Sequence, residues 1–358
     1  MTRAAGMTSL AVAFPSVVRT NAFFRERHPD VVAAAEQKAL ARLWARGVAD
    51  TPFTREMQPY LADPFRGAVE RRVLGPGESA LSLETRAARD ALSAAGLEAA
   101  ELDGILVSSF LADQIGVGNA PRLADALGAR CAAWNFETAC SASVVGLQTA
   151  AALVRAGEHR RVLVVASCTY SRFVDERDTL SWFLGDGAGA FVVSEVDDGY
   201  GYLGGASLHS ADTCGTFSYE LALDPLGKPE VSMVASPSTG RVLAETAEKY
   251  VRECCLGAAD RARVRLSDIA LFVFHTPVPW FPPFAAKLLG VDPARTVSVN
   301  AWTSNIGPAL MPANLHHAAS TGRLRHGDLV MLQSIGSASS AAAAVIRWNA
   351  PGLGPRTF

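Results

Sequence analysis

The chain has 358 residues, which at roughly 150 residues per domain predicts two domains, or one large one, with ample core. Hydrophobic residues make up 49% of the chain and charged residues 19%, a globular profile that excludes a disordered protein. The formal net charge of −2 argues against a nucleic-acid-binding protein that relies on a broad basic surface.

Two runs of alternating strands and helices follow one another along the chain. The first contains an Ala-rich helical segment, a strand at 102–109, a strand and turn at Ala133–Cys140, the helix Val144–Arg155, a strand that starts at His159, and a strand at Gly189–Glu195. The second contains a strand at 267–274, a strand and turn at Val297–Asn305, the helix Ala309–Ser320, a strand that starts at His326, and a strand at Ala341–Trp348. This alternation indicates an α/β protein.

The two runs contain landmarks at nearly one offset. The offset is 165 residues from Asp103 to Asp268 and from Cys140 to Asn305, and 167 from His159 to His326. Chance agreement is the alternative, because all α/β proteins alternate strands and helices. A duplicated chain is expected to pack as two similar halves about a pseudo-two-fold axis. Cys140 and Asn305 would then face each other at equivalent helix starts.

Six cysteines occur, at positions 131, 140, 168, 214, 254 and 255. No two have the C-x-x-C spacing of a zinc site or thioredoxin motif, so the sequence predicts no metal site. No apolar run follows the N-terminal residues and no eighteen-residue stretch is uninterruptedly apolar, so neither a signal peptide nor a membrane span is expected. Free thiols indicate a reducing, cytoplasmic setting.

Cys140 stands at a strand-to-helix turn among small residues. Unpaired backbone N–H groups and the positive end of the helix dipole favour anions there. We therefore expect the turn to lower the pKa of the Cys140 thiol and to make it a nucleophile. The alternative is a buried cysteine that only packs, which is our interpretation of Cys168 and of the Cys254–Cys255 pair.

His275 follows the apolar strand Ala270–Phe274 and enters a Pro-rich loop. Active-site groups of α/β proteins occupy such positions, and a cysteine nucleophile usually works with a histidine. The alternative is a hydrogen-bonded histidine at a strand end. Gly199–Gly204 fits G-x-G-x-x-G, but no helix is expected after it, so no dinucleotide site is predicted.

Four segments carry a resemblance to a known family. They are Glu137-Thr-Ala-Cys140-Ser-Ala, the glycine-rich Phe183–Phe191, Phe274-His275-Thr-Pro and Ser304-Asn305-Ile-Gly-Pro-Ala. They resemble the nucleophile turn, glycine motif, histidine segment and asparagine segment of the thiolase superfamily of condensing enzymes, in particular 3-oxoacyl-acyl-carrier-protein synthase III (ketosynthase III). The resemblance covers about residues 66–350, and Phe14–Asn21 near the start.

The resemblance implies an α/β fold of the thiolase-like, five-layered αβαβα type, built from two pseudo-symmetric halves. The expected N-terminal half, residues 1–195, holds the nucleophile and an extra segment at about 22–65. The expected C-terminal half, residues 196–358, holds the histidine and the asparagine. The resemblance further implies a homodimer, an acyl carrier protein as partner, and thioester substrates without a cofactor.

The same resemblance implies a catalytic triad of Cys140, His275 and Asn305. The oxyanion hole is expected to use the backbone N–H groups of Cys140 and Ser337. Arg66 and Gly336 are the expected substrate-binding residues.

The implied reaction starts with an acyl group on Cys140 and a malonyl-type thioester that loses carbon dioxide. An amide donates to the developing enolate oxygen, whereas an aspartate would repel it. Asn305 therefore favours carbon–carbon bond formation, in polyketide or specialised lipid biosynthesis, over an acyltransferase that acts on an alcohol or amine. A catalytically silent partner subunit is the third interpretation, and the complete triad argues against it.

Three departures from the family pattern concern the substrates. The first is the extra segment between Asn21 and Arg66, which is either an elaboration of the surface or dimer edge or a lid over the acyl tunnel. Within it, Val31–Arg46 is predicted to be a helix with Asp30 as its N-cap. The family's CoA-stacking tryptophan has no counterpart, which favours carrier-protein substrates. The segment Ala112–Asn119 aligns with a loop that supplies a catalytic glutamate in olefin-type relatives. It contains no glutamate, so their proton-abstracting variant is not expected.

Overall fold

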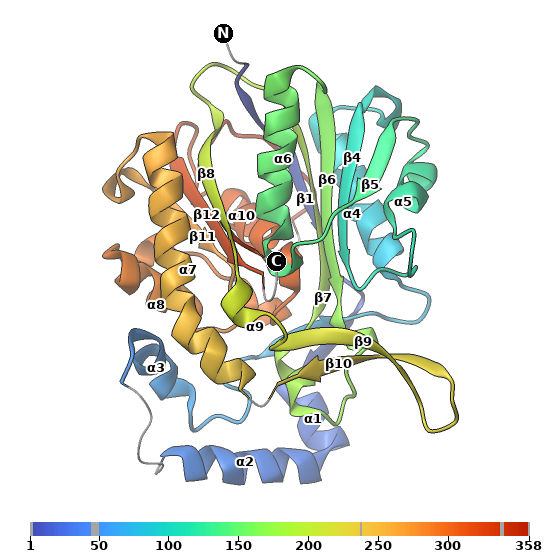
Figure 1. The fold of residues 1–358 in the computed structure, drawn as a ribbon, viewed down its shortest axis with the longest axis vertical. Coiled ribbons are helices and arrows are strands. Elements are labelled where there is room, and N and C mark those ends of the chain that lie inside the picture. The colour runs from blue at the N-terminus through green and yellow to red at the C-terminus, as the bar shows by residue number, and fades with distance from the viewer. Residues whose placement is uncertain (1–2, 44–49, 237, 337–339, 357–358) are drawn as a thin grey trace.

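The strands form two large sheets and two small ones (Figure 1). A computed structural model describes residues 3–43, 50–236, 238–336 and 340–356. The six-stranded sheet has the order β14 (Gly352–Leu353), β1 (Ala5–Ala13), β7 (Asp186–Glu195), β6 (Arg161–Thr169), β4 (Gly104–Phe110), β5 (Ala132–Asn135). The four-stranded sheet has the order β11 (Leu271–Phe274), β12 (Leu329–Ile335), β13 (Ser340–Arg347), β8 (Gly201–His209). The small sheets pair β2 (Val17–Thr20) with β3 (Glu70–Val73), and β9 (Phe217–Leu223) with β10 (Pro229–Ala235).

The two large sheets share one topology. In the first, β4 runs parallel to β6, β6 antiparallel to β7, and β7 antiparallel to β1. In the second, β11, β12, β13 and β8 repeat the same sequence of one parallel and two antiparallel pairs. Two parallel strands must be joined by a crossover connection. The last helix of the connection from β4 to β6 is α6 (Ala142–Ala156), and the last helix of the connection from β11 to β12 is α10 (Leu310–Ser320). The shared order confirms the two pseudo-symmetric halves that the sequence offset predicted.

Helices and sheets alternate in five layers (Figure 1). The helices α6 and α10 pack between the two large sheets. The outer face of the six-stranded sheet is covered by α4 (Ala80–Ala95) and α5 (Ala120–Leu127). The outer face of the four-stranded sheet is covered by α7 (Thr239–Ala262) and α8 (Phe281–Leu289). The described chain also contains α1 (Asn21–Arg27), α2 (Pro29–Leu43), α3 (Pro52–Met57) and α9 (Asn300–Thr303).

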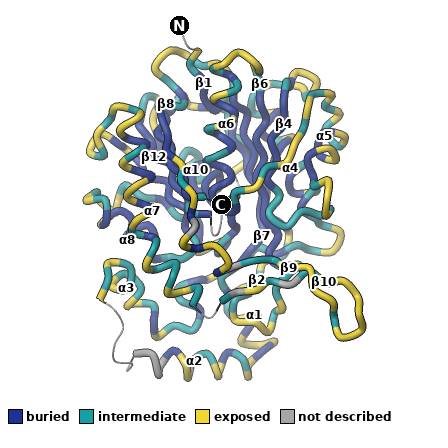
Figure 2. Tube along the Cα trace, in the orientation of Figure 1, coloured by how far each residue is buried: buried dark blue, intermediate teal, exposed yellow. Residues whose placement is uncertain are grey.

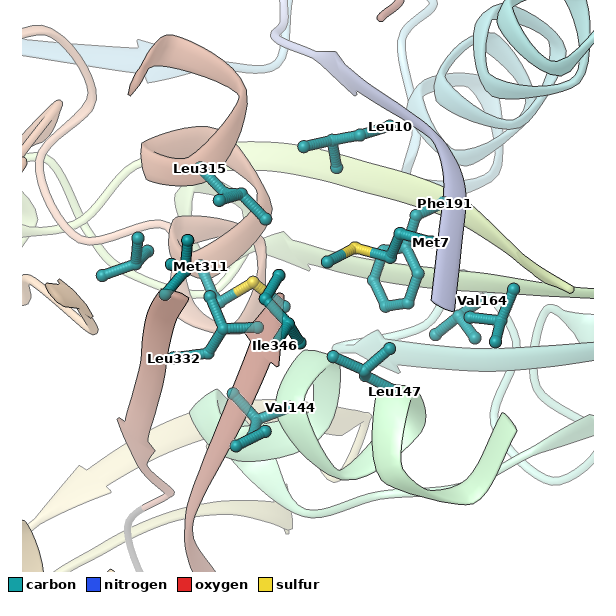
Figure 3. Packing of buried hydrophobic residues seen from close by; sticks show 14 of the residues in the cluster. Met7, Leu10, Val144, Leu147, Val164, Phe191, Met311, Leu315, Leu332 and Ile346 are labelled. Atoms are coloured by element: carbon teal, nitrogen blue, oxygen red, sulfur yellow. The ribbon is translucent and has the colours of Figure 1, made fainter. Parts of the chain in front are cut away.

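The central layer holds a large apolar cluster whose side chains come from both halves. Figure 3 shows Met7, Leu10 and Phe191 from the first sheet, Leu332 and Ile346 from the second, and Val144, Leu147, Met311 and Leu315 from the two central helices. The strands around this layer are buried along most of their length, whereas the β9–β10 hairpin is mostly exposed (Figure 2). Of the described residues, Ala139–Ala156 is long and apolar enough to cross a membrane by length and composition alone. Its apolar side chains pack within this layer.

A glycine lets the central helix α10 approach the six-stranded sheet closely. A Cβ atom on Gly189 of β7 would lie 2.2 Å from Pro312 Cγ of α10, far inside contact distance. At least one glycine of the motif Phe183–Phe191 is therefore required by close packing between β7 and α10.

Two sequence expectations about local structure are wrong. The segment Val297–Asn305 forms no strand and turns into α9. Only isolated bridges occur at its ends, from Thr296 just before it to Phe272 and from Asn305 to Leu184. Its alternation lasts only three residues. Hydroxyl and amide side chains then bond to nearby backbone, a competitor of strand pairing: Thr303 Oγ1, for example, donates to Val299 O at 3.2 Å.

The helix in the extra segment was predicted with the wrong start. α2 begins at Pro29, so Asp30 lies in its first turn rather than at the N-cap. The predicted end at Arg46 lies outside the described residues. Gly201, within the G-x-G-x-x-G match, begins strand β8 and not a helix, as expected.

Candidate active site

Cys140, His275 and Asn305 line one cavity of about 1640 Å³. The wall is mainly apolar, and the volume exceeds the roughly 300–1,000 Å³ of ordinary ligand pockets. Elements of both halves contribute to the wall. Within the part of the chain that the structure describes, no group of three or more His, Cys, Asp or Glu side chains is placed to hold a metal ion.

Cys140 lies in the 3₁₀ turn η3 (Ala139–Ser141), which leads directly into α6. Ala139 has φ of +50°, a left-handed conformation that a residue with a Cβ adopts at a cost. Ser334 Oγ, at the end of β12, donates to Cys140 O at 2.6 Å. The second half of the chain thus holds the turn that carries the thiol of the first.

The expectation that the turn lowers the pKa of Cys140 is wrong for the substrate-free protein. Burial raises the pKa of this thiol to about 12, because a thiolate loses its hydration there. Tyr170 Oη, 3.9 Å from Cys140 Sγ, lowers the pKa, and the charge of Glu137 raises it further. Cys140 is therefore a neutral thiol in the substrate-free protein.

His275 directly follows β11 and is buried. Its backbone N–H donates to Gln333 O of β12 at 2.8 Å, which continues the parallel pairing one residue past the strand. Burial lowers the pKa of the His275 imidazole to about 4, although its hydrogen bond to Asn305 favours the charged form. The ring is therefore neutral at pH 7.

Asn305 lies between α9 and the 3₁₀ turn η9 (Gly307–Ala309) that precedes α10. Its backbone N–H donates to Phe183 O at 3.0 Å, and Gly185 N donates to Asn305 O at 2.9 Å. The turns η3 and η9 are in contact. The glycine-motif segment of the first half thus fixes the backbone of Asn305 near the turn that carries Cys140.

The amide of Asn305 has a defined orientation. Its Oδ1 accepts the Gly307 N–H at 2.9 Å and lies 3.3 Å from His275 Nε2. An amide oxygen only accepts, so we assign the hydrogen of the His275 ring to Nε2. Asn305 Nδ2 is then the amide group available to donate to a ligand.

The other predicted site residues have mixed outcomes. Arg66 lines the cavity. Gly336 does not line it but packs on the nucleophile turn, where a Cβ would lie 2.1 Å from Thr138 O. Ser337, the predicted second oxyanion donor, lies outside the described residues.

Comparison with known proteins shows which family has this arrangement. The models for 3-oxoacyl-[acyl-carrier-protein] synthase III and for its C-terminal part match residues 135–222 and 259–348. The chain is 35% identical over 298 residues to beta-ketoacyl-[acyl-carrier-protein] synthase III of Roseiflexus castenholzii, which covers 79% of this chain and 88% of the relative. The chain belongs to the ketosynthase III family. Identity to the Desulfitobacterium hafniense synthase III is 29% over 307 residues, 80% of this chain and 88% of the relative.

Solved structures share the ketosynthase III fold with this chain. The synthase III of Thermus thermophilus has a TM-score of 0.79 at 26% identity, covering 96% of this chain and 99% of that one. OleA of Xanthomonas campestris has a TM-score of 0.77 at 23% identity, covering 97% and 99%. These likenesses confirm the expected thiolase-like, five-layered fold.

The extra segment of this ketosynthase III chain forms one wall of the cavity. The contributing residues include Val31, Ala34, Ala35, Lys38 and Ala39 of α2, and Phe53, Thr54 and Met57 of α3. Aromatic contacts anchor it to the body: the tilted rings of Phe65 and Trp182 have centroids 4.6 Å apart, and the edge-to-face rings of Phe53 and Phe284 5.2 Å apart. Of the two interpretations of the segment, the structure supports a cover over the cavity.

Sequence reasoning missed two cavity residues beside Cys140. Tyr170 follows the buried strand β6, and a polar residue after an apolar strand was the signal that identified His275. Glu137, three residues before Cys140 in the sequence, also lines the cavity. The sequence interpretation assigned it no role beyond the family motif. A carboxylate so close to a candidate nucleophile was a usable signal.

Proposed function

We propose that this ketosynthase III-like protein loads an acyl group on Cys140 and joins it to a malonyl-type thioester, with loss of carbon dioxide. The observation that supports the proposal is the hydrogen bond between neutral His275 and Asn305 on the wall of the cavity that also holds Cys140. The product is a β-ketoacyl thioester for polyketide or specialised lipid biosynthesis.

In the loading step, the sulfur of Cys140 attacks the carbonyl carbon of an acyl thioester. We assign the tetrahedral oxyanion to the backbone N–H of Cys140 and to a second donor at Ser337. The carbon–sulfur bond to the carrier then breaks. The proton that leaves Cys140 ends on the released carrier thiol, so the step is balanced.

In the condensation step, Asn305 Nδ2 donates to the thioester oxygen of the malonyl group. The single ring hydrogen of His275, which points to Asn305 Oδ1 in the substrate-free protein, has to turn to that oxygen to donate as well. Burial keeps the imidazole neutral, so it can stabilise the enolate without being a strong acid that would protonate the carbanion. Carbon dioxide leaves, the carbanion attacks the acyl carbon, and the bond to Cys140 breaks. The released thiolate takes a proton from solvent.

We further propose that an acyl carrier protein delivers the thioesters and that the enzyme is a cytoplasmic homodimer. The edge of the six-stranded sheet supports the dimer. In the described chain β5 pairs on one side only, with β4, and Trp134 on β5 is 37% exposed. Asn135 Nδ2 binds Val117 O at 2.7 Å, which places the exposed Val117 beside this edge.

Mass spectrometry of the intact protein and its products tests the reaction. Acyl and malonyl thioesters should give an adduct that Cys140→Ala removes, followed by carbon dioxide release and a β-ketoacyl product. Cys214→Ala, at an exposed thiol, is the matched control and should keep both. Transfer to an alcohol or amine without decarboxylation would indicate the acyltransferase instead. Absence of any adduct would indicate a silent partner subunit.

A further inference from the structure

Tyr170 brings a hydroxyl group to the sulfur of Cys140. Its Oη forms a hydrogen bond with Cys140 Sγ at 3.9 Å, a contact in which the sulfur can accept as well as donate. Both residues are buried, with 2% and 7% of their surface exposed, and both line the cavity. Of the described residues, Tyr170 is the one whose side chain hydrogen-bonds to this sulfur. The contact therefore involves the atom that would carry the acyl group.

The backbone on both sides of Tyr170 is fixed by hydrogen bonds. Thr169 Oγ1 donates to Leu111 O at 3.1 Å, and Ser171 N donates to Asp186 Oδ1 at 2.9 Å. Ser171 Oγ donates to the second oxygen of the same carboxylate. The buried aspartate of the glycine-rich motif thus holds the short turn that begins at Tyr170, and this turn keeps the tyrosine at the cavity wall.

The side chain of Tyr170 is held as well. Its ring meets that of Phe110 edge to face, with centroids 5.7 Å apart, a favourable arrangement of aromatic rings. A Cβ added to Gly307 would lie 3.6 Å from Tyr170 Oη, so the hydroxyl packs against the turn that follows Asn305. The hydroxyl thus contacts both the turn that carries Cys140 and the turn next to the asparagine.

Tyr170 can act on the sulfur as a donor and not as a base. Burial raises the pKa of the Tyr170 phenol well above its usual value, and a negative charge on Cys140 raises it further, so the hydroxyl keeps its proton. Beside a neutral thiol, either group can donate. Beside a thiolate only the hydroxyl can, because the sulfur then has no hydrogen. A hydrogen bond to a charged acceptor is stronger than one to a neutral acceptor, so the contact strengthens as negative charge develops on the sulfur.

The other polar side chains near Cys140 do not stabilise its thiolate in this structure. The ring hydrogen of His275 points to Asn305 Oδ1, and Asn305 Nδ2 is the donor that we assign to the malonyl oxygen. The charge of Glu137 disfavours the thiolate and raises the pKa of Cys140, whereas the hydroxyl of Tyr170 lowers it. Because burial disfavours a charged sulfur, the step that forms the thiolate needs a donor of this kind.

We propose that Tyr170 is a further catalytic residue, which donates a hydrogen bond to the Cys140 sulfur in the two steps in which that sulfur carries negative charge. The proposal rests on the acyl-Cys140 intermediate of the proposed function, and it assigns a role to a residue that the triad does not include. It also explains why the glycine-rich motif places a buried carboxylate behind Tyr170: Asp186 fixes the turn that aims the hydroxyl at the sulfur.

Both steps are balanced without proton transfer to or from Tyr170. In the loading step, the S–H bond of Cys140 breaks, the sulfur forms its bond to the acyl carbon, and the proton ends on the released carrier thiol. In the condensation step, the bond between that carbon and the sulfur breaks, and its electron pair stays on the sulfur. The thiolate then takes a proton from solvent. Tyr170 keeps its own hydrogen throughout.

Alkylation of Cys140 measures the hydrogen bond without any acyl substrate. Iodoacetamide labelling rates of the parent enzyme and of Tyr170→Phe are compared between pH 7 and 10 by peptide mass spectrometry. Phenylalanine keeps the ring and removes the donor, so the pKa of Cys140 should rise. The labelling rate should then fall at least about tenfold at each pH, as expected for the loss of a hydrogen bond to a charged group. The exposed Cys214 is the internal reference and should keep its rate.

Tyr219→Phe is the matched control. Tyr219 lines the same cavity, but its hydroxyl donates to Met233 Sδ at 3.2 Å. The labelling rate of Cys140 in this variant should equal that of the parent enzyme. No decrease in Tyr170→Phe, or the same decrease in both variants, overturns the proposal.

A reaction without the sulfur shows whether Tyr170 acts on Cys140 or on the shape of the whole site. Cys140→Ala enzyme keeps His275 and Asn305, and we expect it to release carbon dioxide slowly from a malonyl thioester. Adding Tyr170→Phe should leave this rate within about twofold, because two changes that act on different groups combine additively. A decrease as large as that in the labelling rate would show that the change disturbs the whole site, and would overturn the catalytic role.

Acyl loading separates this proposal from the proposed function. With Cys140 intact, Tyr170→Phe should slow the formation of the acyl adduct by a factor similar to that for labelling. Unchanged loading in Tyr170→Phe overturns the role of Tyr170 and leaves the proposed function intact. Absence of any acyl adduct on the unmodified enzyme overturns the proposed function, and with it the catalytic role of Tyr170, even where the labelling rates confirm the hydrogen bond.

Discussion

His275 Nε2 and Asn305 Oδ1 lie 3.3 Å apart, and the same oxygen accepts the backbone N–H of Gly307 at 2.9 Å. The backbone therefore fixes the amide, and the amide fixes the imidazole with its hydrogen on Nε2. Because burial lowers the pKa of His275 to about 4, the pair carries no net charge at neutral pH. The wall beside the neutral thiol of Cys140 thus presents the Asn305 Nδ2 group as a donor, without a cation.

Asn305→Asp should separate acyl loading from condensation. The change keeps the shape of the side chain but puts a negative charge where an enolate oxygen would develop. We expect condensation to fall by about 10²–10³, as for the loss of an oxyanion-hole donor, while acyl loading on Cys140 changes by less than about tenfold. Intact-protein mass spectrometry measures loading, and chromatography of the products measures condensation.

Asn349→Asp is the matched control, since this amide donates to Met7 O at 2.8 Å and does not line the cavity. Asn349 is half-buried and a carboxylate there cannot donate to Met7 O, so this variant should lose some stability, but its ratio of condensation to loading should stay within about twofold of that of the parent enzyme. Equal loss of loading and condensation in Asn305→Asp would contradict the assigned role of the amide.

The alkylation rate of Cys140 should depend steeply on pH. Only the thiolate reacts, and burial raises the pKa of Cys140 to about 12. The thiolate fraction, and with it the rate, should therefore rise about tenfold for each pH unit between 7 and 10. Iodoacetamide labelling followed by peptide mass spectrometry measures this rate, with the exposed Cys214 as the internal reference. A rate that is already constant above pH 7 would show that Cys140 is a thiolate at neutral pH and would contradict its raised pKa.

The fold could be predicted from the sequence because it depends on long periodic elements. The offset between Cys140 and Asn305 predicted two copies of one α/β unit, and four strands of the six-stranded sheet, β4-β6-β7-β1, correspond in order to β11-β12-β13-β8. Val297–Asn305 was predicted wrongly because its apolar alternation spans only three residues before hydroxyl and amide side chains take over. Short alternations do not determine whether the backbone pairs with a neighbouring strand or turns on itself.

The sequence predicted which residues lie in the site better than it predicted their protonation. Cys140, His275 and Asn305 meet in one cavity, as expected, but the helix start does not lower the pKa of the thiol. Burial depends on how both halves close around the turn, which no local pattern contains. Glu137 is a different case, because a carboxylate three residues before Cys140 was visible in the sequence, and the structure adds that both residues line the same cavity.

Substitutions in α2 should change which acyl chains the enzyme accepts. Ala34 lines the cavity, and its neighbour Ala33 is exposed and does not. Ala34→Trp would fill part of the volume, so we expect the preferred acyl chain to become shorter, with at least about tenfold loss of kcat/KM for the longest substrates. Competition among acyl thioesters of increasing length, with products measured by mass spectrometry, gives the preference.

Ala33→Trp is the control and should keep the preference of the parent enzyme. An unchanged preference in Ala34→Trp would show that the acyl chain does not extend to α2. The cover would then have another role, such as exclusion of water from the cavity.

Gly189→Ala should destabilise the protein through contact between β7 and α10. The added Cβ would lie 2.2 Å from Pro312 Cγ, and the ring of a proline inside a helix cannot move without moving the backbone. Overpacking of this kind costs about 1–3 kcal/mol in the free energy of unfolding, and urea denaturation followed by circular dichroism measures it.

Gly240→Ala is the matched control, because no atom lies within 4 Å of its added Cβ and alanine favours the first turn of α7. Its stability should stay equal or rise. If Gly189→Ala were as stable as this control, α10 would have to shift away from the six-stranded sheet, and loading of Cys140 would then change as well, since η9 connects α10 to the turn that carries the thiol.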